Sequence, residues 1–204
     1  MASGDLRAFV RANLPDPPSR VLEVGAGDGR LGRALRAAGY DVLAIDPTSD
    51  SDDVRAVALA ELDEPAGSFA AAVAIVSLHH VDPLDESCRR LGEVVEPGGT
   101  LIVDEFDIDR FDLLAAGWWL EQCRAFGEPQ STTAEDLVAD HRAHLHPLER
   151  ILAALEPDFE LGLPLRGAWL HRWKLGDSVR AVEEEAIALG RLPATGARLV
   201  GRRR

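Results

Sequence analysis

The chain has 204 residues, a formal net charge of −13 at pH 7, and 46% hydrophobic against 28% charged residues. That length suits one domain with a substantial core, so we expect residues 1–204 to form a single domain. The acidic balance argues against binding to nucleic acid, which requires a basic surface. Residues 1–20 lack the apolar core of a secretory signal, and no apolar run approaches the ~20 residues of a membrane span. We therefore expect a cytoplasmic protein without membrane or nucleic-acid partners.

The first half of the chain alternates apolar strands with helices, the pattern of a parallel α/β sheet. A glycine-rich loop follows the first strand, and a continuous apolar run further on indicates a strand buried on both faces. The elements expected in chain order are a helix over 3–13, a strand over 20–24, a helix over 30–38, strands over 41–45, 54–59 and 69–76, a helix over 85–95, and a strand over 100–103.

After Asp104 the alternation ends and helices dominate. We interpret residues 110–145 as a helical lid inserted over the carboxyl edge of the sheet, where α/β proteins bind their ligands. The elements expected are helices over 111–126, 133–144 and 146–155, a strand within 160–173, a helix over 178–190 with Glu183, Glu184 and Glu185 on a solvated face, and a last strand over 197–201.

Two local features of the composition have simple structural interpretations. Cys88 and Cys123 belong to no Cys-x-x-Cys pair, so we expect neither a disulfide framework nor a thiolate zinc site. Both cysteines are predicted to pack as small apolar residues. The basic cluster at 202–204 follows the last predicted strand, and we interpret it as a solvated tail.

The strongest local motif is Glu23-Val24-Gly25-Ala26-Gly27-Asp28-Gly29, which includes the end of the first predicted strand. Three glycines at every second position let the backbone turn tightly and approach a ligand closely. Such a turn lies at the carboxyl end of a strand, where ligands bind in open α/β sheets. Asp46, at the end of the next strand, is placed to accept hydrogen bonds from two ribose hydroxyls.

Two classes of nucleotide ligand share this geometry. A dinucleotide loop needs the pattern Gly-x-Gly-x-x-Gly, but here the third glycine, Gly29, comes one residue early and Arg30 takes the required position. Glu23 would also repel a pyrophosphate, whereas a carboxylate at that position suits a ligand with an ammonium or sulfonium group. A nicotinamide-dependent oxidoreductase is therefore the weaker interpretation.

Over about half of the chain, residues 20–103, the motifs resemble those of the class I S-adenosylmethionine-dependent methyltransferases, in particular the small type 11 kind. The glycine loop with Glu23 matches the family's first motif, and Asp46 matches its ribose-binding acid. The resemblance implies a Rossmann-like, seven-stranded, mostly parallel sheet with helices on both faces and an antiparallel hairpin at one edge. Further matches lie at 67–69, 77–81 and 93–100.

By that resemblance, S-adenosylmethionine is the cofactor and S-adenosylhomocysteine the product. The glycine loop would hold the methionine part of the cofactor, and the ends of the following strands would hold the nucleoside. The cofactor residues implied are Glu23 beside the amino group, Gly25, Ala26, Gly27 and Gly29 around the methionine part, Asp46 at the ribose, Pro47 and Leu59 at the adenine, and Ser77 and Leu78 at the sulfonium end.

Two positions depart from the family pattern. Many relatives carry an aspartate that accepts a hydrogen bond from the adenine amino group, where this chain has Ala58. Many also read Ser-Phe-Asp before the fourth strand, where this chain has Ala70 after Ser68 and Phe69. The first change removes one hydrogen bond, about 0.5–1.5 kcal/mol. These departures keep open a second class of function, a non-catalytic methyltransferase-like protein that binds the cofactor or regulates a partner.

Histidines are the candidate catalytic bases, because the imidazole pKa lies near working pH. His80 follows the fourth predicted strand at the edge where the methyl group would lie, although a histidine there can instead bond the neighbouring loop. His141 and His144 fall three residues apart on one helix face, and we interpret them as a polar wall of the acceptor site or as a solvated face. No third ligand has a specific spacing, so we expect no metal.

Polar and aromatic residues after the fifth predicted strand complete the candidate site. Asp104 and Glu105 are expected to face it, with helix capping as the alternative for Asp104. Of Trp118 and Trp119, one is expected to line an aromatic pocket and the other to pack in the core. The sequence thus favours methylation of a small organic molecule, with oxygen as the preferred acceptor atom because histidines and carboxylates surround the predicted site.

Overall fold

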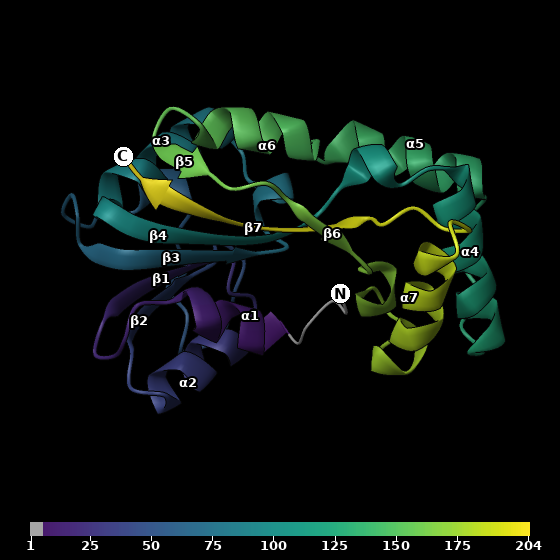
Figure 1. Cartoon of the computed structure of the whole chain (residues 1–204), viewed down its shortest axis with the longest axis horizontal. Coiled ribbons are helices and arrows are strands. Elements are labelled where there is room, and N and C mark those ends of the chain that lie inside the picture. The colour runs from purple at the N-terminus through teal and green to yellow at the C-terminus, as the bar shows by residue number, and fades with distance from the viewer. Residues whose placement is uncertain (1–5) are drawn as a thin grey trace.

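A computed structural model describes residues 6–204, so residues 3–5 of the predicted first helix lie outside the described part of the chain. The chain forms a seven-stranded sheet in the order β2-β1-β3-β4-β7-β5, with β6 also paired to β7. β7 runs antiparallel to β4, β5 and β6, and all other pairs are parallel (Figure 1). The predicted Rossmann-like, mostly parallel α/β sheet is confirmed. The strands are β1 (Arg20–Val24), β2 (Asp41–Ile45), β3 (Phe69–Ile75), β4 (Val95–Phe106), β5 (Phe159–Leu161), β6 (Leu165–Gly167) and β7 (Gly196–Arg203).

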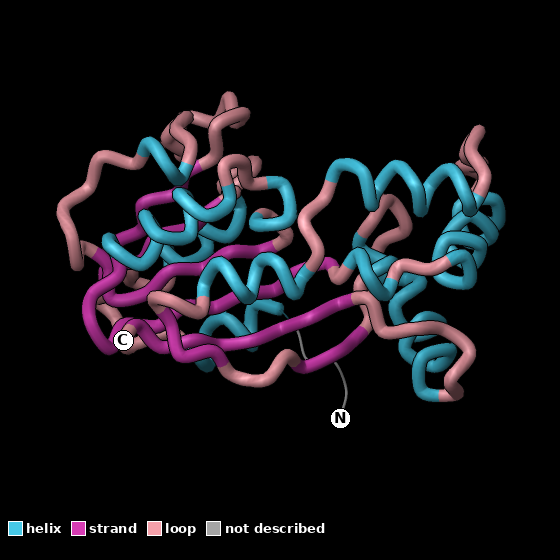
Figure 2. Tube along the Cα trace, turned by 90° about the horizontal axis from the view of Figure 1, so that it is seen from above, coloured by secondary structure: helices cyan, strands magenta, loops and turns pink. Residues whose placement is uncertain are grey.

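Helices cover both faces of the sheet because strand side chains alternate between two apolar cores. Leu22 and Leu101 pack with α3 and α6 on one face, whereas Val21 and Ile102 pack with α1 and α2 on the other. Figure 2 shows these layers from above. In the described residues, no helix is long and apolar enough to cross a membrane. The helices of the two layers are α1 (Leu6–Asn13), α2 (Arg30–Ala37), α3 (Leu84–Val94) and α6 (Leu148–Leu155).

A third apolar core joins helices that are far apart in the sequence. It contains residues of α4 (Leu113–Ala125) and α5 (Ala134–His144) together with residues between 169 and 192, where α7 (Arg180–Ala188) lies. Figure 1 shows α4, α5 and α7 together beyond the end of β4. The helices predicted as a lid are therefore one part of a larger helical cap, which we define as residues 108–145 and 168–192.

The strand predicted over 54–59 is wrong. Arg55 makes a single parallel bridge to Ile45, and residues 59–61 form a short 3-10 helix instead. The Val57 N–H donates a hydrogen bond to the Arg55 carbonyl at 2.9 Å. This tight turn directs the chain away from the sheet edge, so pairing with β2 ends after one residue. The strand predicted within 160–173 divides into β5 and β6, which pair with opposite ends of β7. Pro164 lies between them and has no N–H to give to a ladder.

The basic cluster at the end of the chain is not a solvated tail. Arg202 and Arg203 belong to β7, and the Arg202 guanidinium donates to Thr100 Oγ1 at 2.7 Å. Arg203 pairs with Asp158 at 3.0 Å, which ties β7 to the turn before β5. The predicted packing of the two cysteines is confirmed, since both are buried in apolar cores. Burial raises the pKa of the Cys88 thiol to about 12.

Candidate functional site

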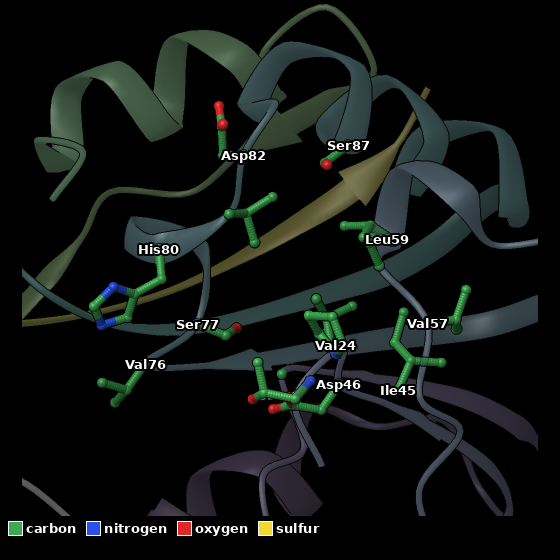
Figure 3. A pocket seen from close by; sticks show the side chains of 15 residues that line it. Val24, Ile45, Asp46, Val57, Leu59, Val76, Ser77, His80, Asp82 and Ser87 are labelled. Carbon is green, nitrogen blue, oxygen red and sulfur yellow. Dashed lines mark hydrogen bonds between the residues drawn. The ribbon is translucent and has the colours of Figure 1, made fainter. Parts of the chain in front are cut away.

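A cavity of about 410 Å³ opens at the carboxyl ends of β1, β2 and β3 (Figure 3). In the close-up, Val57 and Leu59 lie at one end of the cavity, His80 and Val76 lie at the other, and Asp46 lies between them. Apolar walls with a few polar groups are typical of nucleotide-sized sites. The predicted cofactor residues that line this cavity are Gly25, Asp46, Pro47, Leu59 and Ser77.

The glycine loop is fixed by its contact with the next strand. The N–H groups of Gly25 and Ala26 both donate to the Ile45 carbonyl, at 2.9 and 3.0 Å. Gly25 has a φ of +68°, and a Cβ added to it would lie 2.3 Å from Ser77 Cβ. Only glycine fits there, because the backbone at the end of β1 passes close to Ser77, two residues after the end of β3.

The Asp46 side chain links the end of β2 to the glycine loop. Its Oδ2 accepts from the Gly27 N–H at 2.9 Å, and its Oδ1 accepts from the N–H and the hydroxyl of Thr48 at 2.9 and 2.8 Å. Partial burial raises the pKa of Asp46, but the hydrogen bonds from Thr48 and Gly27 outweigh it and hold that pKa below its usual value. Oδ2 keeps an acceptor site for a ribose hydroxyl, and rotation of the Thr48 hydroxyl frees a second on Oδ1.

Glu23 lies apart from this cavity. Its carboxylate is 4% exposed and lies under α2, where a Cβ on Gly32 would come within 2.6 Å of Oε2. Oε2 has no hydrogen-bond partner among the described residues, and burial raises the pKa of Glu23 to about 7. Four more predicted cofactor residues do not line the first cavity: Ala26, Gly27, Gly29 and Leu78. The Gly27 N–H donates to Asp46, which does line it, and the Leu78 side chain packs in the core.

Glu105 holds the turn that carries His80. This turn is a short 3-10 helix, η2 (Leu78–His80), and Glu105 is fully buried beneath it. Glu105 Oε1 accepts from the N–H groups of Ser77 and Leu78 at 2.9 and 2.6 Å, and Oε2 lies 2.5 Å from His79 Nδ1. The prediction that Glu105 faces the ligand site is wrong, because Glu105 is fully buried and lines neither the first cavity nor the one between η2 and the helical cap. Of the two histidines in η2, His79 has the structural role, and its ring contacts strand β4 at Glu105 and not a neighbouring loop.

A second cavity, of about 470 Å³, lies between η2 and the helical cap. It shares the lining residues Val76 and His80 with the first cavity, so the two cavities are adjacent at the carboxyl end of β3. Val76 has a φ of +53°, a strained conformation for a β-branched residue and one that occurs mainly at functional sites. The other lining residues are His79, Phe106, Asp140, His141, His144, Leu145, Trp169, Arg172 and Trp173.

The second cavity brings together the three histidines predicted as catalytic. Burial lowers the pKa of His80, and the neighbouring His79 lowers it further, so His80 is neutral near pH 7. His141 is half-buried and its Nδ1 lies 2.8 Å from the Leu137 carbonyl. The His144 side chain is 70% exposed and pairs with Asp140 at the outer rim. His80 alone of the three also lines the first cavity.

Buried acids also hold the opposite wall of the second cavity. Asp104 accepts from the guanidinium groups of Arg172 and Arg198 at 2.6 and 2.5 Å, so it is not free to bind a ligand as expected. Glu183 is fully buried, so the predicted solvated face is wrong for this residue, whereas Glu184 is half-buried and Glu185 is exposed. Glu183 repeats the geometry of Glu105: its carboxylate accepts from the backbone N–H groups of residues 169–171 and lies 2.8 Å from His171 Nδ1.

Two tryptophans of the lining were not singled out from the sequence. Trp169 and Trp173 are four residues apart, on either side of His171 and Arg172, in a segment predicted as strand. The spacing of these two aromatic residues is the sequence signal that could have indicated them. Trp119 packs in the core, stacked on Trp173 with ring centroids 3.9 Å apart, and Trp118 does not line the cavity. In residues 6–204, no group of three or more His, Cys, Asp or Glu side chains could hold a metal ion.

A parallel sheet with a glycine loop after β1 and an acid after β2 defines a Rossmann-like nucleotide-binding protein. The chain matches the methyltransferase domain family over residues 2–144. It is 30% identical over 166 residues to an uncharacterized methyltransferase of Staphylococcus carnosus, covering 74% of this chain and 76% of that protein. The chain therefore belongs to the methyltransferase domain family, in the class I group that uses S-adenosylmethionine.

Further relatives agree with this assignment. The chain is 34% identical over 111 residues to ubiquinone biosynthesis O-methyltransferase of Xanthomonas campestris, covering 47% of this chain and 46% of that protein. It thus spans about half the length of this curated relative. Solved structures with the same fold include S-adenosylmethionine-dependent methyltransferases from Mesorhizobium loti (TM-score 0.62, 18% identity, 96% of both chains) and Methanosarcina mazei (TM-score 0.63, 17% identity, 98% of both chains).

The residues of the first cavity fit S-adenosylmethionine. Asp46 presents acceptor oxygens beside Gly25 and Gly27, and the walls near Val57 and Leu59 are apolar, as an adenine ring requires. Ala58 lines this end without a side-chain acceptor for the adenine amino group, so any such bond must come from the backbone.

Proposed function

We propose that this chain methylates an oxygen atom of a small organic acceptor bound in the second cavity. The observation that carries the proposal is that this cavity shares two lining residues, Val76 and His80, with the cavity that fits the cofactor. An acceptor in one space and a cofactor in the other would touch at the carboxyl end of β3. Bringing two reactants together in this way contributes about 7–11 kcal/mol to lowering a barrier.

Asp46, Gly25 and the walls near Leu59 would hold the cofactor at one end of the first cavity. When bound, S-adenosylmethionine supplies a methyl group on a positively charged sulfur, and the electron pair of the broken carbon–sulfur bond stays on the sulfur of S-adenosylhomocysteine. His80 would accept the hydroxyl proton of the acceptor as its oxygen bonds to the methyl carbon, and then release that proton to solvent. The lowered pKa of His80 keeps the ring neutral and able to accept it.

Replacing His80 tests this function. We expect His80→Gln to lower kcat by about 10²–10⁴-fold, the usual contribution of a general base, and to leave the affinity for S-adenosylhomocysteine within a few-fold. The acceptor panel would contain small alcohols, phenols, carboxylic acids and amines, with S-adenosylhomocysteine formation as the readout.

Three outcomes of that assay separate the alternatives. Turnover of hydroxyl acceptors by the wild type and its loss in the variant would support the proposal. Full turnover by the variant would remove His80 from the chemistry, and methylation of amines alone would overturn the choice of oxygen. Binding of the cofactor without turnover of any acceptor would favour the non-catalytic class, for which Ala58 and Ala70 are the sequence arguments.

A further inference from the structure

The second cavity is lined by a continuous series of aromatic rings. Phe106 stacks on Trp169 with centroids 4.3 Å apart, and it meets the His141 ring edge-on at 6.2 Å. His141 in turn meets Trp173 at 4.9 Å. On the side of the cofactor cavity, the series continues from Phe106 through His79 to His80. Ring lining on this scale favours a ligand that is itself flat and aromatic, since aromatic pairs add about 0.5–1.5 kcal/mol to the burial of area.

The lining also limits the charge of the ligand. Among the described residues of this cavity, Arg172 is the one permanently charged cation, and its guanidinium is bound to the buried Asp104 at 2.6 Å. Asp140 lies at the outer rim and adds negative charge. A carboxylate or phosphate on the ligand would have to compete with Asp104 for Arg172 while facing Asp140. The cavity therefore suits an uncharged ligand.

The aromatic wall has a polar side chain at the end that adjoins the cofactor cavity. His80 lies there and lines both spaces, whereas Trp173 lines the second cavity alone. A flat ligand along the wall would thus place one edge beside His80 and the opposite edge toward the helical cap. A hydroxyl group on the edge beside His80 would lie where the proposed methyl transfer takes place.

We propose, building on the function proposed above, that the methyl acceptor is an uncharged phenol held against Phe106, Trp169 and Trp173 with its hydroxyl directed to His80. In the step, the phenolic oxygen bonds to the methyl carbon, and its proton passes to His80. The products are an aryl methyl ether, S-adenosylhomocysteine and a proton released to solvent, so atoms and charge balance. A phenol suits this site better than an aliphatic alcohol because its ring stacks and its hydroxyl ionises near pH 10, within reach of a histidine base.

The test compares three acceptors of similar size on the full chain in the presence of cofactor. Catechol is the aromatic, uncharged probe; cyclohexane-1,2-diol is matched in size but not flat; and 3,4-dihydroxybenzoate adds a negative charge to the aromatic ring. We expect catechol to have the highest kcat/KM, with the other two at least tenfold lower. Binding of each probe in the presence of S-adenosylhomocysteine would be measured by calorimetry.

Variants of the wall give the second readout. Trp173→Leu should weaken catechol binding by about 3–10-fold, the loss of one aromatic contact, while Trp173→Phe restores most of it. Trp118→Leu is the matched control: Trp118 belongs to the same cap but does not line the cavity, so catechol binding should stay within twofold. Circular dichroism of each variant checks that the cap remains folded.

The outcomes distinguish this inference from the proposed function. If cyclohexane-1,2-diol is methylated as well as catechol, or Trp173→Leu binds catechol like the wild type, the aromatic acceptor is excluded while methyl transfer to oxygen stands. A higher kcat/KM for 3,4-dihydroxybenzoate would overturn the uncharged class. If catechol binds with the predicted dependence on Trp173 but no acceptor is methylated, the proposed function fails and the aromatic binding site is retained.

Discussion

Gly25→Ala is expected to destabilise the protein by about 1–3 kcal/mol more than Gly27→Ala. Both glycines have positive φ, +68° and +55°, so alanine at either position carries a left-handed strain of about 1–2 kcal/mol. A Cβ at Gly27 meets no atom within 4 Å, whereas a Cβ at Gly25 comes 2.3 Å from Ser77 Cβ. The loop after β1 and the turn after β3 must move apart to admit it, and such overpacking costs about 1–3 kcal/mol.

Urea unfolding of the two variants measures this difference, with equal m-values as the condition for comparison. The Gly25 variant should also lose cofactor affinity, because Gly25 and Ser77 both line the first cavity. Gly27→Ala should lose less, provided that its N–H still reaches Asp46. Equal destabilisation in the two variants would contradict the close contact between Gly25 and Ser77.

Glu105→Gln is expected to lower the free energy of unfolding by about 2–4 kcal/mol. Oε1 accepts both backbone N–H groups and Oε2 contacts His79 Nδ1. An amide that keeps its oxygen on the two N–H groups directs its N–H₂ group at His79 Nδ1, and the negative charge that strengthens all three contacts is lost. Because the same contacts fix η2, the variant should also bind S-adenosylhomocysteine more weakly, about tenfold. Ser77, which precedes that turn, and His80, its last residue, would no longer be held against the first cavity.

Glu183→Gln provides the control for that experiment. Glu183 is equally buried and makes similar contacts, with three backbone N–H groups of residues 169–171 and with the His171 ring, on the wall remote from the cofactor. We expect a similar loss of stability with cofactor affinity within twofold of the wild type. Should both variants lose cofactor affinity equally, the effect would reflect general destabilisation and not the positioning of η2. Thermal unfolding and calorimetry on the same samples provide both numbers.

The parts of the fold that the sequence predicts best are those set by local pattern. The apolar runs of β1, β2 and β3, the glycine loop and the acid at Asp46 were all read from consecutive residues. The strand expected over 54–59 failed because a turn at Val57, invisible in composition, ends its pairing after Arg55. β4 begins at Val95, five residues before the predicted start at Thr100. Within that extension Val95 pairs with Phe69 of β3, and pairing with β7 begins only at Thr100.

The polar contacts of the site could not be derived in the same way, because they join residues far apart in the chain. Glu105 and Glu183 are ordinary acidic residues by sequence, and their burial depends on N–H groups of turns 27 and 13 residues away. Asp104 pairs with Arg172 and Arg198, 68 and 94 residues further on. Only the tertiary packing shows that these acids support the walls of the second cavity and do not face a ligand.

Calorimetric titration with S-adenosylhomocysteine, with NAD as the comparison ligand, tests the central claim most directly. The wild type should bind S-adenosylhomocysteine with a dissociation constant on the order of micromolar, about −8 kcal/mol, and should not bind NAD. Asp46→Ala should weaken that binding by about 10–100-fold, since hydrogen bonds to a charged group contribute about 1.5–3 kcal/mol. Binding of NAD instead, or an Asp46→Ala variant that binds S-adenosylhomocysteine as tightly as the wild type, would contradict the cofactor site described at the ends of β1, β2 and β3.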